Sequence, residues 1–297
     1  MPIKRAKVLV LGAGGIIGQH LLISCPDGLD GIFTRRSATS APWTAFDAEK
    51  DDVMQFLDTL RPDVIINLAG ENRVDVVEAS PEKYHAVNVR LPGILAQWAS
   101  SNDSYLIQAS SQGVFSGHAP TYSPDDAPDP LTQYGKQKAL AESAALSISN
   151  SEVVRLTFVL GIRPFQDIGR RNPVEDMIEQ RHQFQVNDKF FSPAFAKDCA
   201  EILWKRAINR KSDGQRVMHL GTPVRCTRYA IASDLKHLMP GHINQNIEPV
   251  SNDHFPGIAP RPDDTTWNAE RCLYNSSYED GLAGCISDWN KLNSPGK

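Results

Sequence analysis

Short apolar runs alternate with amphipathic stretches through the first half of this chain. The run at 8–11 precedes a helix-like segment at 19–24, and a helical segment at 51–60 ends at Arg61-Pro62, before the apolar run 64–68. Further strands are expected at 31–34, 105–109, 152–160 and 216–220, and further helices at 81–100, with a break at Pro92, at 131–147 and at 195–208. Strands that alternate with helices predict an α/β fold with a Rossmann-type, doubly wound parallel sheet.

A glycine-rich turn joins the first expected strand to the first expected helix. Its sequence GAGGIIG runs from Gly12 through Gly15 to Gly18, with the spacing GxxGxxG. The first glycine allows a tight turn, the second lets backbone N–H groups approach a pyrophosphate, and the third lets the helix pack close to its strand. The helix N-terminus adds N–H donors and a positive dipole end. The spacing favours the dinucleotide site of extended short-chain dehydrogenases, and a tight turn without a ligand is the alternative.

The alternation of strands and helices weakens beyond residue 161. Two stretches, 163–189 and 249–262, carry charges and prolines instead. We therefore expect a nucleotide-binding Rossmann domain at 1–162, to which 195–242 returns, and a smaller C-terminal substrate lobe built mainly by 163–297. The length of 297 residues is enough for both.

Composition narrows the class of protein. A formal net charge of -4 argues against general binding of nucleic acid. Five widely spaced cysteines without a CxxC pair predict neither a disulfide framework nor a zinc site, and the eight histidines show no metal-ligand spacing, so no metal is expected. No apolar run approaches a membrane span and no cleavage site follows the N-terminal run, so we expect a cytoplasmic protein without a membrane partner.

Two arginines follow the second expected strand. Arg35 and Arg36 stand where an acidic residue would hold the adenosine ribose of NAD. A cationic pair at this place favours the 2′-phosphate of NADP, and a surface charge pair is the alternative. Asp47 and Ala48 follow a third strand-like stretch, where an acceptor can meet the adenine amino group.

Tyr134 and Lys138 form a YxxxK pair at the start of an expected helix. Residues four apart share one helix face, so we expect the Lys138 ammonium to lie near the Tyr134 phenol and to lower its pKa from about 10. Such a phenol can donate a proton to a carbonyl oxygen near neutral pH. Ser110 and Ser111 end an upstream strand, where a hydroxyl can reach the same oxygen. A capping serine and a solvated helix face are the alternative.

Together these motifs resemble the dTDP-4-dehydrorhamnose reductase branch of the extended short-chain dehydrogenases, over most of the chain. Other segments that carry the likeness are 61–67, Val74-Asp75, Val87-Asn88, Val114-Phe115, 155–161, 191–193 with Asp198, His219-Leu220 and Arg261-Pro262. The resemblance implies a reductase that uses NADPH to reduce a 4-keto group on a nucleoside-diphosphate sugar. A homodimer is a further expectation.

The resemblance also implies roles for individual residues. Tyr134 would protonate the developing alkoxide, Ser111 would stabilise the oxygen, and Lys138 would tune the tyrosine and hold the nicotinamide ribose. The implied cofactor residues are Gly12, Gly15, Ile16, Ile17, Gly18, Arg35, Arg36, Asp47, Ala48, Leu68, Ala69, Gly70, Asn88, Tyr134 and Lys138. The implied substrate residues are Gln112, Phe158, Lys189, Phe191, Ser192 and Arg261, with Lys189 and Arg261 facing the diphosphate.

The chain departs from this branch beside the catalytic serine. Ser111, Gln112 and Gly113 stand where the reductases usually have threonine, aspartate and tyrosine. Serine preserves the hydroxyl, but the loss of a carboxylate and a ring changes the substrate-facing wall. Two other hypotheses therefore stay open. One is an NAD-dependent nucleotide-sugar epimerase or dehydratase, against which the Arg35-Arg36 pair argues, and the other is a non-catalytic NADP-binding regulator similar to the β subunit of methionine adenosyltransferase.

Overall fold

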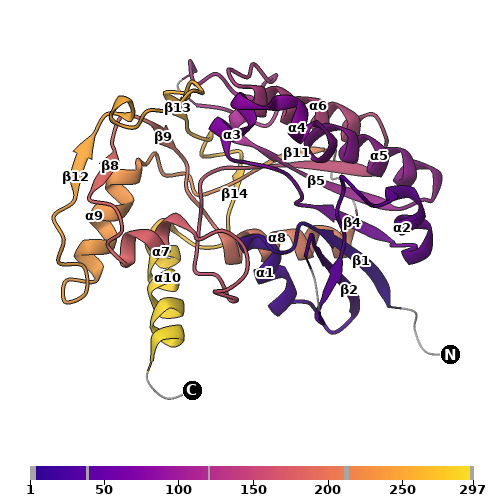
Figure 1. The fold of residues 1–297 in the computed structure, drawn as a ribbon, viewed down its shortest axis with the longest axis horizontal. Helices are drawn as coiled ribbons and strands as arrows, with labels where there is room; N and C mark the ends of the chain where they lie inside the picture. Colours follow the sequence, from indigo (N-terminus) through magenta and orange to yellow (C-terminus); the bar gives the residue numbers. More distant parts are fainter. Residues whose placement is uncertain (1–4, 38–39, 120, 211–213, 295–297) are drawn as a thin grey trace.

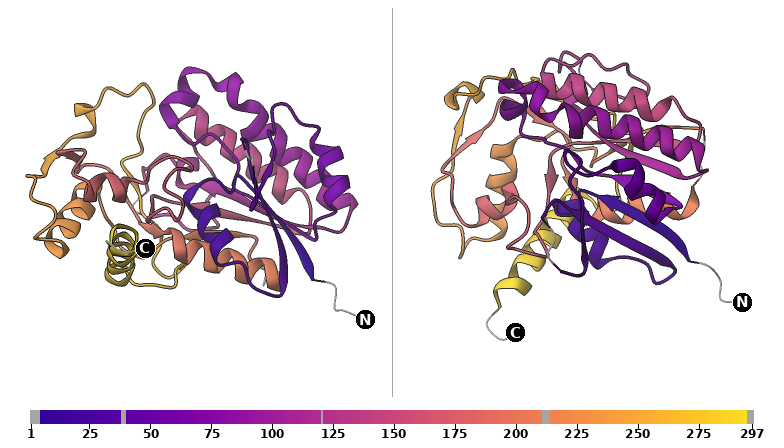
Figure 2. Two further views of the ribbon diagram at one scale, coloured as in Figure 1. Left: turned by 60° about the horizontal axis from the view of Figure 1, so that its bottom comes forward. Right: turned by 45° about the vertical axis from the view of Figure 1, so that its right-hand side comes forward.

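A computed structural model, which describes residues 5–37, 40–119, 121–210 and 214–294, contains a large parallel sheet with helices on both faces (Figures 1 and 2). Its strand order is β14-β11-β6-β5-β4-β1-β2-β3. The strands are β1 (Ala6–Leu11), β2 (Leu29–Arg35), β3 (Trp43–Ala45), β4 (Val64–Asn67), β5 (Tyr105–Ser111), β6 (Ser151–Leu156), β11 (Val217–Leu220) and β14 (Cys272–Leu273). The order reverses between β1 and β4, the switch point of a doubly wound sheet. The predicted α/β Rossmann-type fold is confirmed.

Side chains of the central strands enter two separate cores. Val8 and Val10 of β1 pack with α1 (Ile16–Ile23) and α8 (Ala196–Asn209), whereas Leu9 packs with the opposite layer. The opposite layer contains α2 (Val53–Leu60), α3 (Val74–Ala79), α4 (Pro81–His85), the π-helical turn η1 (Ala86–Arg90), α5 (Leu91–Ser101) and α6 (Gln133–Leu146). Burial on both faces explains why β1 is a continuous apolar run. Among the helices of the described part of the chain, none has the length and apolarity of a membrane span.

A smaller lobe lies to the left of the sheet in Figure 1. Its core joins α7 (Pro173–Ile178), α9 (Arg228–Leu238) and α10 (Tyr278–Asn293). Three two-stranded sheets complete it, pairing β7 (Val159–Leu160) with β10 (Ala194–Phe195), β8 (Phe184–Val186) with β12 (Glu248–Val250), and β9 (Phe190–Phe191) with β13 (Asp264–Thr265). Two short 3-10 turns are η2 (Gln112–Val114) and η3 (Asn252–His254).

The boundaries between sheet and lobe differ from those expected. Within 195–242, α8 and β11 pack on the sheet, but α9 belongs to the lobe because Ile231 and Leu235 enter its core. Conversely, Cys272–Leu273 from the expected lobe forms the edge strand β14 of the large sheet. The chain therefore crosses between the two parts more often than its composition indicates.

The helix expected to break at Pro92 continues through it. Pro92 has no N–H to donate to the carbonyl of Asn88, four residues earlier. The π-helical turn η1 absorbs this loss, and the N–H of Leu91 donates to the carbonyl of Ala86, five residues earlier. Asn88 lies inside the turn that Pro92 imposes.

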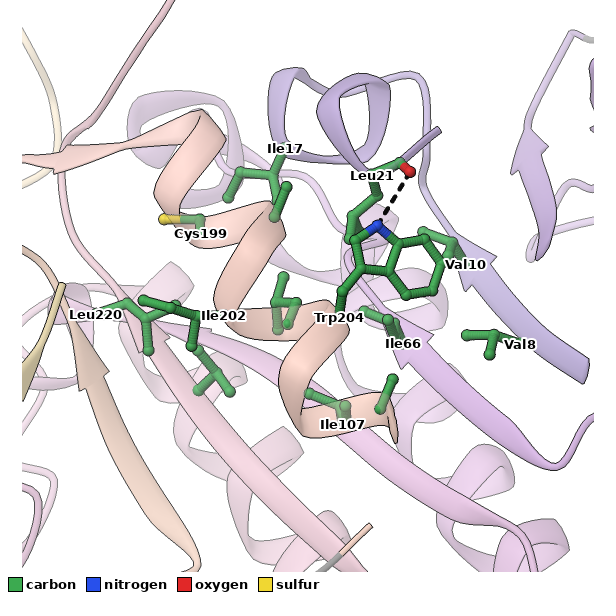
Figure 3. Packing of buried hydrophobic residues seen from close by; sticks show 14 of the residues in the cluster. Val8, Val10, Ile17, Leu21, Ile66, Ile107, Cys199, Ile202, Trp204 and Leu220 are labelled. Carbon is green, nitrogen blue, oxygen red and sulfur yellow. Dashed lines mark hydrogen bonds between the residues drawn. The ribbon is translucent and has the colours of Figure 1, made fainter. Parts of the chain in front are cut away.

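Trp204 fixes α8 against α1. Its indole N–H donates to the Leu21 carbonyl at 3.1 Å (Figure 3). Its ring meets Phe33 edge-on, with centroids 6.3 Å apart. Because α1 follows the glycine turn directly, this contact also fixes the turn.

Replacement of Trp204 by phenylalanine keeps an aromatic ring but leaves the buried Leu21 carbonyl without its donor. We expect a loss of about 1–3 kcal/mol in the free energy of unfolding, measured by urea denaturation. Trp43→Phe is the matched control, since the Trp43 indole N–H donates to no residue that the structure describes. Equal losses in the two variants would contradict a structural role for the Trp204 hydrogen bond.

Candidate active site

The glycine turn brings three segments of backbone into contact. Gly12 has φ +74°, and a Cβ atom there would lie 2.6 Å from the backbone nitrogen of Ala69. A Cβ atom on Gly18 would lie 2.3 Å from the Cα atom of Ala13. Gly15 caps α1 without a side-chain hydrogen bond, and the first turn of α1 has no acidic residue. This helix N-terminus, which has no side-chain cap, fits the pyrophosphate of a dinucleotide.

A segment of the lobe packs over this turn. The sequence did not predict this contact. The buried Gln19 amide donates to the carbonyls of Gly14 at 3.0 Å and Ile168 at 2.9 Å, and its oxygen accepts from the Phe165 N–H at 2.9 Å. Gly169 has φ +74°, and a Cβ atom there would lie 2.3 Å from the Gly14 carbonyl oxygen. Gln19 therefore joins the glycine turn to residues about 150 positions later in the chain.

Asn88 connects the loop after β4 to α6. Its side-chain oxygen accepts from the Glu71 N–H at 2.9 Å, and its amide nitrogen donates to Gln137 at 2.8 Å. Asn88 is buried, and Gln137 lies on the helix that carries Tyr134 and Lys138. The π-helical turn thus ties the loop beside the glycine turn to α6.

The three expected catalytic residues meet at the carboxyl end of β5. The Ser111 hydroxyl accepts from the Gly113 N–H at 3.1 Å, and a Cβ atom on Gly113 would lie 3.4 Å from the Ser111 hydroxyl oxygen and 3.3 Å from a carbon of the Tyr134 ring. The Lys138 ammonium donates to the Ala109 carbonyl at 2.6 Å. All three side chains line one cleft, as the YxxxK spacing and the serine at the strand end predict.

Burial is the largest influence on the pKa values of Tyr134 and Lys138. It raises the pKa of Tyr134, while the hydrogen bond from Ser111 acts in the opposite direction and the charge of Glu71 adds to the rise. Burial also lowers the pKa of Lys138 to about 8, against the charge of Glu142. The expected lowering of the Tyr134 pKa is therefore wrong for this arrangement, because desolvation of the phenol outweighs its polar contacts.

A buried ion pair between Glu142 of α6 and Arg155 of β6 lies next to these residues. Glu142 accepts from the Ser110 hydroxyl at 2.5 Å and from two nitrogens of Arg155 at 3.0 and 2.9 Å. Arg155 also donates to His219, whose pKa is lowered to about 3 by burial and by the Arg155 charge. Glu142 was not among the expected site residues, although it stands four residues after Lys138, on the face that Tyr134 and Lys138 share.

The cleft encloses about 1180 Å³ between the sheet and the lobe. This volume exceeds that of a typical single-ligand site, so a dinucleotide and a second molecule fit together. Most of the expected site residues line it: Gly12, Gly15, Ile16, Ile17, Gly18, Leu68, Ala69, Gly70, Asn88, Ser111, Gln112, Tyr134, Lys138, Phe158, Lys189, Phe191 and Arg261.

The expected adenosine-side residues stand outside the cleft wall, beside the glycine turn. A Cβ atom on Gly14 would lie 3.5 Å from the Cβ atom of Arg35, whose Nε is shielded from solvent and has no partner among the described residues. Arg36 is exposed and lies 3.9 Å from Asp47, next to the buried Ala48. An unpartnered guanidinium nitrogen beside the turn fits an additional phosphate.

Ser192 is not brought to the cleft. Its buried hydroxyl accepts from the Trp267 N–H at 3.0 Å, so the side chain joins two segments of the lobe. The apolar pattern around 190–193 gave no signal that the serine would face inward while Phe191 lines the cleft.

The two cations expected at the diphosphate already have acidic partners. Lys189 lies 2.5 Å from a carboxylate oxygen of Asp263, and Arg261 pairs with Asp75. Four other arginines line the cleft and were missed: Arg73, Arg170, Arg171 and Arg228.

A family profile, curated relatives and solved structures all match most of this chain. The profile of the RmlD substrate binding domain family matches residues 6–288. A dTDP-4-dehydrorhamnose reductase from Aggregatibacter actinomycetemcomitans is 30% identical over 96% of this chain and 96% of its own length. The methionine adenosyltransferase 2 subunit beta of Rattus norvegicus is 31% identical over 77% of this chain and 71% of its own length. A structure of the Bacillus anthracis dTDP-4-dehydrorhamnose reductase in complex with NADP, 21% identical, has a TM-score of 0.81 and covers 96% of this chain and 100% of that chain.

The depressed pKa of Lys138 gives a pH dependence of stability. Between pH 8 and about 10.5 the unfolded chain still binds the proton that the folded chain has lost, so the free energy of unfolding rises with pH. Relative to Lys138→Met, we expect the wild-type protein to gain about 3 kcal/mol across this window, measured by urea denaturation. Lys136→Met, on the exposed face of the same helix, is the control. Parallel pH profiles for the wild type and Lys138→Met would show that Lys138 keeps an ordinary pKa.

Proposed function

Because this chain belongs to the RmlD substrate binding domain family, we propose that it is an NADPH-dependent reductase of a 4-keto group on a nucleoside-diphosphate sugar. One observation carries the proposal: Ser111, Tyr134 and Lys138 converge on the same cleft as the uncapped glycine turn. A proton donor and a dinucleotide site then serve one reacting carbonyl.

The cofactor residues divide by the part of the cofactor that each suits. Backbone N–H groups from Gly15 onward would hold the pyrophosphate, and Arg35 and Arg36 would hold the 2′-phosphate. Lys138 would donate to the nicotinamide ribose in place of, or beside, the Ala109 carbonyl. NADPH supplies the hydride when it is bound.

The protonation states suit reduction. Tyr134 has a raised pKa, so its phenol holds a proton near neutral pH and can transfer it to the carbonyl oxygen as that oxygen gains negative charge. Ser111 donates a second hydrogen bond to the same oxygen and stabilises the developing alkoxide. A charged Lys138, with a pKa of about 8, favours the tyrosinate that the transfer leaves.

The wall opposite the cofactor suits a sugar. Gln112 accepts a hydrogen bond from the Thr157 hydroxyl, which fixes its side chain beside Ser111. Phe158 packs on Phe191 with ring centroids 4.7 Å apart and presents an apolar surface to the cleft. Aromatic faces of this kind stack on sugar rings and bases.

A regulatory role is the second candidate, favoured by the likeness to the methionine adenosyltransferase 2 subunit beta. A regulator would bind NADPH without consuming it. The reductase is preferred because all three catalytic side chains are present and converge.

The proposal is tested by following NADPH absorbance with freshly generated dTDP- and UDP-4-keto-6-deoxy sugars. We expect oxidation of NADPH, and a fall in turnover of about two to four orders of magnitude in Tyr134→Phe, which keeps the ring but lacks the proton donor. The Kd for NADPH should be the same in both proteins. A folded wild type that binds NADPH but oxidises it with none of these sugars would favour the regulatory role instead.

Cofactor choice provides a separate test. A guanidinium–phosphate contact corresponds to a preference of about ten- to a hundredfold for NADPH over NADH, and Arg35→Ala with Arg36→Ala should abolish it. Both Kd values can be measured by fluorescence titration. Lys50→Ala is the control, since it removes a nearby exposed cation that pairs with Asp47. Equal affinities for the two cofactors in the wild type would contradict NADP use and favour an NAD-dependent enzyme.

A further inference from the structure

The arginines and the lysine on the rim of the cleft differ in their partners. Most of them bind a carboxylate: Arg73 pairs with Glu71, Arg171 with Asp176, Lys189 with Asp263 and Arg261 with Asp75. Arg170 donates to the Asn72 side chain at 2.8 Å. The Arg228 side chain donates no hydrogen bond to any residue in the described ranges, and its Nε is shielded from solvent.

The Arg228 guanidinium lies over an aromatic ring. Its guanidinium carbon lies 5.5 Å from the centroid of the Phe158 ring. Burial lowers the pKa of Arg228, and the charge of Asp176 opposes this effect. Asp176, however, already accepts from Arg171 at 2.8 Å and lies 3.7 Å from Arg181. Among the residues that the structure describes, Arg228 is thus a partly buried cation without a carboxylate partner of its own.

The position of Arg228 at the start of its helix adds to the unfavourable free energy of its buried charge. It is the first residue of α9, and the first turn of that helix contains no acidic residue. The Thr227 hydroxyl, which caps the helix, accepts from the Ala230 N–H at 3.1 Å. A cation at a helix N-terminus opposes the helix dipole. Both the side chain and the helix end would be stabilised by an anion in the cleft.

Arg228 is connected to the reacting centre through a short series of neighbours. Gln112, next to the catalytic Ser111, binds Thr157, and Phe158 follows Thr157 and faces Arg228. An anion that contacted Arg228 would therefore lie on the lobe side of a molecule bound at Ser111. A sugar nucleotide carries its diphosphate next to the sugar.

We propose that Arg228 binds the diphosphate of the sugar nucleotide, at the phosphate attached to the sugar. This rests on the proposed function, and it assigns to Arg228 the role expected for Lys189 and Arg261. The guanidinium fork matches a phosphate and supplies two parallel donors. Lys189 and Arg261 keep their carboxylate partners and contribute less.

The test is calorimetric titration of UDP and dTDP into the protein saturated with NADPH. Arg228→Met should weaken the binding of whichever diphosphate the wild type prefers by about ten- to a hundredfold. The matched variant Lys189→Met should weaken it by less than about threefold, because Asp263 already neutralises Lys189. The Kd for NADPH should stay unchanged in both variants, and Arg228→Lys should recover part of the loss.

A second measurement separates binding from a structural role. Removal of an unpaired cation from the start of α9 should leave the melting temperature of the free protein unchanged or raise it. A lower melting temperature in both Arg228→Met and Arg228→Gln would overturn the proposal, since it would show that Arg228 supports the fold. An unchanged affinity for UDP and dTDP in Arg228→Met would overturn it as well.

Two further measurements show which group of the ligand carries the anion, and whether a negative result rejects the substrate class or only the role of Arg228. If Arg228→Met loses affinity for UDP-glucuronic acid but not for UDP or UDP-glucose, the anion is a carboxylate on the sugar, and the diphosphate assignment is wrong. If the wild type binds NADPH but neither UDP nor dTDP, the proposed substrate class fails together with this inference. If the wild type binds a diphosphate that Arg228→Met binds equally well, only the role of Arg228 fails.

Discussion

The contact of backbone with backbone where the sheet order reverses is the constraint on which the rest of the structure depends. Gly12 meets Ala69 at the end of β4, and Gly18 meets Ala13 at the start of α1, at distances that leave no room for a Cβ atom. These contacts place the N-terminus of α1 at the switch point, which is where a ligand can bind across a doubly wound sheet. Trp204 then fixes α1 from the side of α8 (Figure 3).

From the glycine turn, hydrogen bonds of buried polar side chains extend to the elements that carry the proposed catalytic residues. Gln19 holds the lobe segment that packs on the glycine turn, and Asn88 ties the loop after β4 to α6. Glu142 of α6 holds both Ser110 of β5 and Arg155 of β6. These side chains each make several hydrogen bonds, and buried networks of this kind hold the elements that they join in a defined arrangement.

The sequence predicts features that depend on residues close together in the chain, and it does not reveal contacts between residues far apart in the chain. The glycine turn and the Tyr134–Lys138 pair are local, so spacing was enough to find them. The pairing of Lys189 with Asp263, 74 residues later, leaves no local signal, nor does the burial that raises the Tyr134 pKa. Pro92 was expected to break the helix at 81–100 because its N–H is missing, but a π-helical turn satisfies the backbone in another way.

Transfer of deuterium tests the central claim, that hydride passes in this cleft from NADPH to a sugar carbonyl. The protein is incubated with NADPH deuterated at C4 of the nicotinamide and with a 4-keto sugar nucleotide, and the nucleotide sugar is then analysed by mass spectrometry and NMR. The account predicts a reduced product with one deuterium on the former carbonyl carbon. Protein that binds the deuterated cofactor but yields a nucleotide sugar without deuterium at that carbon would contradict it.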